Sequence, residues 1–207
     1  RFVSDASHEM KTPLAGIKLL TDSILQTENI DPATTREFVS DIGAEASRLE
    51  RITEDLLRLT RLDSGAVEPA VCVPVKPVLE RAARMLQPVA GQREVELTCQ
   101  ADEAAAVRAT EGDVHQILYN LMENGVKYTA PGGFVHTSVS VEEGRVVITV
   151  SDNGIGIPAE DMPHIFERFY RVDKARSRQI GGTGLGLSIV GDTVQRRGGE
   201  IGVAPRE

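Results

Sequence analysis

The sequence predicts two parts, a helical hairpin followed by an α/β sandwich. In two long N-terminal stretches, apolar residues recur mostly at steps of three, four or seven, which is typical of helices in a bundle. The rest of the chain mixes helical stretches with short alternating strands, which favours one open sheet with helices on one face. A turn-forming sequence at residues 63–66 separates the two, so we expect domains at residues 1–65 and 66–207.

The hairpin consists of two predicted helices. The first covers residues 1–28, and the second runs from Pro32 to about Leu62 with Asp31 as its N-cap. Two helices alone cannot bury both of their apolar stripes, so we expect dimerisation into a four-helix bundle. The alternative is that the hairpin packs on the C-terminal domain of its own chain.

One histidine of the first helix has neighbours that suit chemistry. His8 lies two positions from the seam residue Met10, about 200° around the helix, and therefore points away from the seam. Glu9 can orient or deprotonate its imidazole, and Thr12 lies one turn further on the same face. Pro13 cannot donate to the carbonyl of Glu9, so the helix should bend or loosen beside His8.

The elements of the second part follow from local patterns. They are short strands at residues 71–73 and near 107–110, a strand at 95–99, a hairpin of strands at 135–141 and 145–150, and helices at about 76–90, 113–128 and 188–197.

Two glycine-rich runs predict a nucleotide site. The first, residues 152–158, follows a strand, and its glycines Gly154 and Gly156 let the backbone approach a flat base closely. The second, residues 181–187, opens a helix whose unpaired N–H groups and positive dipole end suit phosphate.

A polar face of the predicted helix at residues 113–128 fits the same site. Asn120 and Asn124 are one turn apart and Lys127 follows, so two amide oxygens and an ammonium converge. This set fits a hydrated Mg²⁺ and the phosphates it carries. A further segment, residues 158–181, is expected to be a lid whose cations reach the phosphates. These cations are Arg168, Arg171, Lys174, Arg176 and Arg178.

Composition excludes several classes of protein. The net charge is −8 and no long basic tract is present, which argues against a nucleic-acid partner. No apolar run approaches the roughly 20 residues that span a bilayer. Cys72 and Cys99 lack metal-ligand spacing and a disulfide framework, so we expect buried free thiols in a reducing compartment.

As a set, these motifs resemble the sensor histidine kinases of two-component systems. Five segments match that family's boxes in the family's order: residues 7–14 its phospho-acceptor box, 113–128 its asparagine box, 152–158 and 181–187 its glycine boxes, and 166–173 its phenylalanine box. The resemblance implies a dimeric four-helix bundle followed by an α/β sandwich ATP-binding domain of the histidine kinase, gyrase and Hsp90 type.

The resemblance also implies a reaction. His8 would take the γ-phosphoryl group of ATP with the help of Mg²⁺ and Glu9, and pass it to an aspartate of a response regulator receiver domain. Removal of the group from that partner, with Thr12 orienting a water, would be a second activity. Asn124 and Asn120 would hold Mg²⁺. The nucleotide-binding residues would be Asn120, Asn124, Lys127, Tyr128, Asp152, Gly154, Gly156, Ile157, Arg171, Gly182, Thr183, Gly184, Leu185, Gly186 and Leu187.

The sequence departs from the family in two places. Gly125 stands where the family usually has alanine, which should cost helix stability. The chain also ends before the family's Gly-x-Gly-Thr-x-Phe segment and last strand, which would leave a sheet edge unpaired. The chain likewise begins just before the phospho-acceptor box, so both ends indicate a piece of a longer protein. We therefore expect the cytoplasmic portion of an inner- or plasma-membrane sensor, attached to the membrane only through segments absent from this chain.

Two alternatives belong to other classes of protein. One is an ATP-hydrolysing conformational machine of the gyrase or Hsp90 type, in which a glutamate at the position of Asn120 activates water. An amide cannot act as that general base, which argues against this alternative. The other is a non-catalytic dimeric scaffold that binds ATP without transferring its phosphoryl group.

Overall fold

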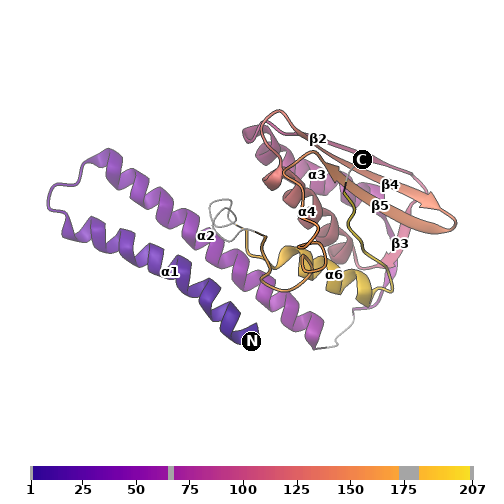
Figure 1. The fold of residues 1–207 in the computed structure, drawn as a ribbon, viewed down its shortest axis with the longest axis horizontal. Helices are drawn as coiled ribbons and strands as arrows, with labels where there is room; N and C mark the ends of the chain where they lie inside the picture. Colours follow the sequence, from indigo (N-terminus) through magenta and orange to yellow (C-terminus); the bar gives the residue numbers. More distant parts are fainter. Residues whose placement is uncertain (1, 65–67, 173–181, 206–207) are drawn as a thin grey trace.

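A computed structural model describes residues 2–64, 68–172 and 182–205. In Figure 1 the hairpin forms an elongated arm, and one of its ends lies against the α/β part. The elements are α1 (Phe2–Gln26), α2 (Pro32–Asp63), β1 (Val71–Pro74), α3 (Val75–Gln92), β2 (Glu96–Ala101), β3 (Ala106–Ala109), α4 (Glu111–Tyr128), β4 (Phe134–Glu142), β5 (Arg145–Asp152) and α6 (Gly186–Arg196).

The two hairpin helices begin and continue largely as predicted. The side chain of Asp31 accepts hydrogen bonds from the backbone N–H groups of Ala33 and Thr34, which confirms the predicted cap of α2. α1 continues through Pro13 as one helix, so the expected loosening beside His8 does not interrupt it. Within the described ranges, neither these helices nor the shorter ones combine enough length and apolar character to pass through a bilayer.

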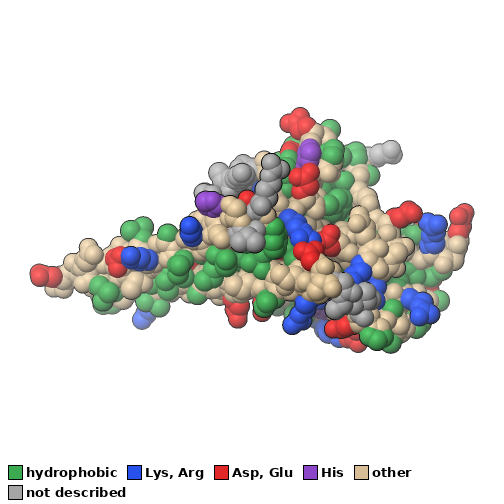
Figure 2. All heavy atoms as spheres, turned by 90° about the horizontal axis from the view of Figure 1, so that it is seen from below, with side chains coloured by type: hydrophobic (Ala, Val, Ile, Leu, Met, Phe, Trp, Pro, Cys, Tyr) green, Lys and Arg blue, Asp and Glu red, His purple; other side chains and the backbone are tan. Residues whose placement is uncertain are grey.

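In the described part of the chain, the α/β part packs against one end of the hairpin's apolar seam. There, Leu59 forms a fully buried cluster with Leu185 and Ile189, and the rings of Phe2 and Phe169 lie beside it, 5.9 Å apart. At this end of the arm the hairpin therefore packs on the α/β part of its own chain, as the alternative to dimerisation proposed. Elsewhere on the arm, large apolar side chains remain exposed, as the green atoms in Figure 2 illustrate. These include Leu14, Leu19, Leu25 and Val39.

The strands of the described residues form two sheets, so the expectation of one open sheet is wrong. β1 pairs antiparallel with β3, whereas β2 pairs parallel with β4 and β4 pairs antiparallel with β5. The physical reason is the short length of β1 and β3 and the short connections that follow them. β1 and β3 have four residues each and lead almost directly into α3 and α4. The two short strands therefore pair with each other and end before either can join the larger sheet.

Helices α3 and α4 cover one face of the three-stranded sheet. Leu118 and Met122 of α4 and Val135 of β4 are fully buried there, and burying a side chain of this size contributes about 1.5–3 kcal/mol. A Cβ on Gly125 would lie 3.0 Å from both methyl groups of Val135. The departure from alanine therefore lets α4 lie close to a bulky valine. Asp152, opposite Val135 in the β4–β5 register, is placed at this same end of the sheet.

The expectation of buried thiols is wrong, because Cys72 and Cys99 are both free and exposed. In β1, side chains alternate between the two faces, and Val73 rather than Cys72 points inward. Cys99 is exposed although it lies on the same face of β2 as the buried Leu97.

Candidate functional site

A cleft of about 2300 Å³ lies between α2, α4, the loop after β5 and the loop before α6. Nearly all of the predicted nucleotide-binding residues line it, although they come from four separate stretches of the sequence. The lining residues among them are Asn120, Asn124, Lys127, Tyr128, Asp152, Gly154, Gly156, Ile157, Arg171, Gly182, Thr183, Gly184, Gly186 and Leu187. Leu185 instead lies in the buried cluster with Leu59 and Ile189.

The first glycine run is folded tightly against the end of α4. Oδ1 of Asp152 accepts a hydrogen bond of 2.9 Å from the backbone N–H of Gly154. A Cβ on Gly154 would lie 2.5 Å from the backbone oxygen of Tyr128, which leaves room only for glycine. Gly156 has φ +70°, a left-handed conformation that favours glycine. This wall of the cleft is thus backbone with little side-chain cover.

The polar face of α4 is partly engaged by its own neighbours. Nζ of Lys127 lies 2.8 Å from Oε2 of Glu123, so its charge is partly neutralised in this arrangement. Oδ1 of Asn120 accepts a 3.0 Å hydrogen bond from Nε2 of Gln116. Asn124 is half-buried in the cleft wall, where its amide oxygen is a hard ligand of the kind that Mg²⁺ takes. The donor set fits Mg²⁺ through Asn124, whereas the oxygen of Asn120 is already hydrogen-bonded.

The second glycine run contacts both α2 and Phe169, which belongs to the segment that resembles the phenylalanine box. Gly184 has φ +73°, and a Cβ there would lie 3.0 Å from Cα of Phe169. The hydroxyl of Thr183 donates a 2.9 Å hydrogen bond to Oδ2 of Asp55 on α2, and burial raises the pKa of Asp55. The run is therefore fixed on two sides before α6 begins at Gly186.

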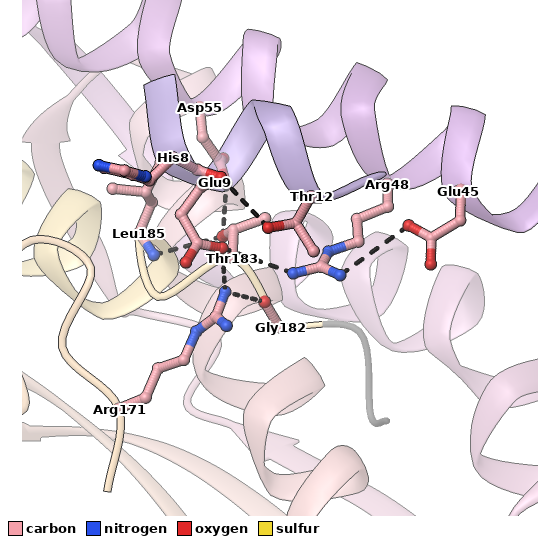
Figure 3. A network of polar contacts seen from close by, with 10 residues as sticks. All are labelled: His8, Glu9, Thr12, Glu45, Arg48, Asp55, Arg171, Gly182, Thr183 and Leu185. Carbon is pink, nitrogen blue, oxygen red and sulfur yellow. Dashed lines mark hydrogen bonds and ion pairs between the residues drawn. The ribbon is translucent and has the colours of Figure 1, made fainter. Parts of the chain in front are cut away.

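One carboxylate connects the hairpin to the cleft (Figure 3). Oε2 of Glu9 lies 3.0 Å from Nη2 of Arg171 and 3.4 Å from Nη2 of Arg48. Arg171 also donates to the backbone oxygen of Gly182. The arginine side chains are only 5% and 7% exposed, and burial lowers the pKa of Arg171. A single ion-pair network thus joins α1, α2 and the second glycine run.

The face that carries the candidate histidine lies outside the cleft. His8 is exposed, as expected, and the exposed hydroxyl of Thr12 donates a 3.3 Å hydrogen bond to the carbonyl of His8. His8, Glu9 and Thr12, all within the described part of the chain, do not line the cleft. In this arrangement the two predicted sites are separate and are joined through Glu9 and Arg171.

The lid prediction is wrong for Arg168. Its guanidinium lies 2.7 Å from Asp63 and 2.9 Å from Asp192, and 5.3 Å from the ring centroid of Phe2. Hydrogen bonding to Asp63, reinforced by Asp192, raises the pKa of Arg168. Two carboxylates and a ring therefore direct it to the junction of α2 and α6. The predicted lid residues Lys174, Arg176 and Arg178 lie outside the described residues.

Sequence reasoning missed the residues of α2 that line the cleft. Asp55 contacts a residue 128 positions away, and no local pattern marks such a contact. Arg58 of α2 donates to Oε1 of Gln116. Gln116 itself had a usable signal, because it lies one turn before Asn120 on the same helix.

Two family models match separate parts of the chain. Residues 1–65 match the His Kinase A (phospho-acceptor) domain, and residues 109–207 match the histidine kinase-, DNA gyrase B- and HSP90-like ATPase domain. The phospho-acceptor model covers the hairpin and His8, and the ATPase model covers the cleft-lining residues of α4 and the two glycine runs.

Named relatives match almost the whole chain. A probable sensor histidine kinase TcrY from Mycobacterium tuberculosis is 39% identical over 204 residues, which cover 99% of this chain and 42% of that protein. The sensor-like histidine kinase SenX3 from Mycolicibacterium smegmatis is 36% identical over 201 residues, covering 97% of this chain and 52% of that protein. The chain spans about half the length of the curated relatives it matches.

Solved structures share the arrangement of hairpin and α/β part. Full-length ShkA in complex with AMPPNP has a TM-score of 0.71 and 29% identity, over 97% of this chain and 42% of that one. The histidine kinase AdeS from Acinetobacter baumannii has a TM-score of 0.71 over 91% of this chain and 86% of that one. At 20% identity, the second likeness concerns the fold alone.

Proposed function

Because this chain belongs to the sensor histidine kinase family, we propose that it phosphorylates His8 from ATP and passes the phosphoryl group to an aspartate of a response regulator receiver domain. One observation supports this most directly. Arg171 contacts both Gly182, in the run proposed to hold phosphate, and Glu9, the neighbour of His8. The proposed donor site and the proposed acceptor helix are thus within reach of one side chain.

The nucleotide would lie along the cleft with its base at the first glycine run. Asp152 accepts a hydrogen bond from the adenine amino group through the carboxylate oxygen that is not bonded to Gly154. Gly156, where a Cβ would meet nothing within 4 Å, leaves the base free to approach the backbone, while Gly154 lets the run lie against Tyr128. Ile157 supplies an apolar contact beside the base.

The phosphates would lie toward the start of α6. Among the described residues no side chain caps α6 at Leu185, and the helix dipole at that end favours negative charge. Lys127, Tyr128 and Arg171 neutralise or position the phosphate tail. Asn124 would hold Mg²⁺, with Asn120 as a second ligand only if its oxygen were released from Gln116, and the ion would neutralise charge on the phosphates.

The transfer step is a displacement at the γ-phosphorus. A ring nitrogen of His8 forms the new bond to phosphorus, the bond to the β–γ bridging oxygen breaks, and ADP leaves. Glu9 accepts or orients the proton on the other ring nitrogen. In the arrangement described here Glu9 is held by Arg48 and Arg171, so the step requires the α/β part to move along the hairpin.

The proposal includes a homodimer. A second copy that covers exposed apolar residues of α1, such as Leu14 and Leu25, completes a four-helix bundle. Because the reaction needs ATP and a receiver domain, we place this portion in the cytoplasm of a membrane sensor whose membrane segments lie outside this chain.

The two alternatives are less well supported. The match of residues 1–65 to a phospho-acceptor domain disfavours a gyrase- or Hsp90-type ATPase, and Asn120 offers no general base for water. The scaffold alternative predicts nucleotide binding without any labelling of the protein.

Incubation with γ-labelled ATP tests the proposal. We expect label that is labile to acid and stable to alkali, and that maps to the peptide containing His8. His8→Gln should abolish labelling and leave ATP binding intact, whereas Asn124→Asp should lose binding. Label on His115, His136 or His164 would refute the assignment of the acceptor, and ATP hydrolysis without label would favour the ATPase alternative.

A further inference from the structure

A chain of hydrogen bonds runs from the hairpin through α4 to the start of α6. Nη1 of Arg58 on α2 donates to Oε1 of Gln116 on α4. Nε2 of Gln116 donates to Oδ1 of Asn120 at 3.0 Å, and Nδ2 of Asn120 donates to the backbone oxygen of Gly186 at 3.0 Å. The residues come from three elements, and the last bond links positions 66 apart in the sequence.

The direction of this chain is determined at both ends. A guanidinium has only donors, so the oxygen of the Gln116 amide must face Arg58 and its nitrogen must face Asn120. A backbone carbonyl only accepts, so the nitrogen of the Asn120 amide must face Gly186. The two ends therefore agree on one orientation of both amides, and reversing either amide would oppose two donors or two acceptors.

The chain ends where the proposed phosphate site begins. Asn120 is 7% exposed, so an amide that loses its partners there finds little water to replace them. Gly186 is the first residue of α6 and lines the cleft together with Asn120 and Arg58. A change in the position of α2 would thus reach the start of α6 through two oriented amides.

We propose that Arg58 and Gln116 are positioning residues: they hold the Asn120 amide in one orientation, and this sets the loop before α6 in the form that receives phosphate. The inference rests on the proposed nucleotide binding. It makes the affinity for nucleotide depend on a donor that the hairpin contributes, so docking of the α/β part on α2 and nucleotide binding are coupled.

The test separates the donor of Arg58 from its positive charge. Arg58→Gln and Arg58→Met both remove the charge and have similar size, but only glutamine can still donate to Gln116. We expect Arg58→Met to bind the ATP analogue AMPPNP with Mg²⁺ about fivefold more weakly than Arg58→Gln, the change expected for one hydrogen bond. Arg58 is half-exposed, so both variants should fold, and their melting temperatures provide the check.

The same pair of Arg58 variants in a Gln116→Leu background tests whether Arg58 acts through Gln116. In Gln116→Leu the chain is broken, so the two Arg58 variants should bind Mg·AMPPNP equally. Equal affinities of Arg58→Gln and Arg58→Met in the native background would overturn the proposal. So would a fivefold difference that persists in Gln116→Leu, because Arg58 would then act by another path.

A measurement without nucleotide distinguishes this inference from the proposed function. The side-chain NH₂ resonances of Asn120 report its hydrogen bonds directly. Gln116→Glu keeps an acceptor for Arg58 but has no donor for Asn120, so those resonances should shift, and unshifted resonances would contradict the chain. If the native protein fails to bind Mg·AMPPNP while the resonances shift, the proposed function fails and the oriented chain stands.

Discussion

The carboxylate of Glu9 lies 3.0 Å from the guanidinium of Arg171, although the two residues are 162 positions apart. The residue beside the proposed phospho-acceptor is therefore bound by a residue of the proposed nucleotide site. Phosphates that attract Arg171 would release Glu9 to act on the His8 ring. The competition between these two partners of Arg171 is open to measurement.

Removing the charge of Glu9 should destabilise the arrangement described here. Glu9→Gln leaves the nearly inaccessible guanidiniums of Arg48 and Arg171 without their shared carboxylate, which should cost about 3 kcal/mol. Denaturant unfolding measures this loss. The matched control is Glu45→Gln. The Glu45 side chain is 35% exposed and its Oε2 lies 3.9 Å from Nη1 of Arg48, so this change should cost less than about 1 kcal/mol. Equal losses in the two variants would show that Arg171 adds nothing.

The pairing of Asp113 with Arg197 should make the free energy of unfolding decrease at acid pH. Burial alone raises the pKa of Asp113, but hydrogen bonds from Arg197 and Thr110 outweigh it and hold the pKa below its ordinary value of 3.8. Because the folded-state pKa is the lower one, the stabilisation is present above about pH 4 and is lost as the pH falls through the folded-state value. The unfolding free energy of Asp113→Asn should therefore fall less steeply below pH 4 than that of the native chain. Asp41→Asn, at an exposed position, serves as control, and an equal change there would contradict the assignment.

Adding one methyl group at Gly154 should damage the nucleotide site. The Cβ of Gly154→Ala would lie 2.5 Å from the Tyr128 oxygen and 2.8 Å from Oδ1 of Asp152, so the run must shift. We expect a loss of about 1–3 kcal/mol in stability and weaker binding of Mg·AMPPNP. Gly91→Ala, within α3 and with nothing within 4 Å of its Cβ, should instead stabilise by about 0.5–1 kcal/mol. Calorimetry of both variants decides between these outcomes.

Two isosteric substitutions should separate metal binding from base recognition. Asn124→Asp adds charge beside the phosphates and Mg²⁺ and should abolish productive nucleotide binding. Asp152→Asn turns an acceptor into a mixed donor and acceptor, and should reduce the preference for ATP over GTP. Competition binding against a fluorescent ATP analogue measures both. Unchanged Mg·ATP affinity in the two variants together would mean that the cleft has been misassigned.

Thr12→Ala should separate two activities of the hairpin face. The exposed Thr12 hydroxyl bonds only weakly to the His8 carbonyl, at 3.3 Å, and remains free to orient a water toward a docked receiver domain. Self-labelling does not need that water, so the variant should retain substantial labelling while removing phosphate from the receiver more slowly. Rates of the two reactions, measured on the same protein, provide the test. A parallel loss of both would mean that Thr12 only supports the turn before Pro13.

The sequence by itself determined the elements and the runs of the chain whose predicted nucleotide-binding residues line the cleft. Repeats of three, four and seven mark helices because their side chains must share one buried face, and Asp31 marks the start of α2 because its carboxylate fits the free N–H groups there. Glycines at 154 and 184 mark places where backbone lies against backbone, since any side chain would collide. Such signals are local, and a sequence displays them directly.

Only the tertiary structure decided which charges meet. Arg168 and Arg171 look alike in the sequence, yet one pairs with Asp63 and Asp192 and the other with Glu9. Their partners lie on elements far away in the chain, and the packing of α2 and α6 around Leu59 brings them together. The separate sheets, the exposed thiols and the chain from Arg58 to Gly186 have the same origin. Each depends on how whole elements are placed, because hydrogen bonds and ion pairs form only where packing first sets the distances.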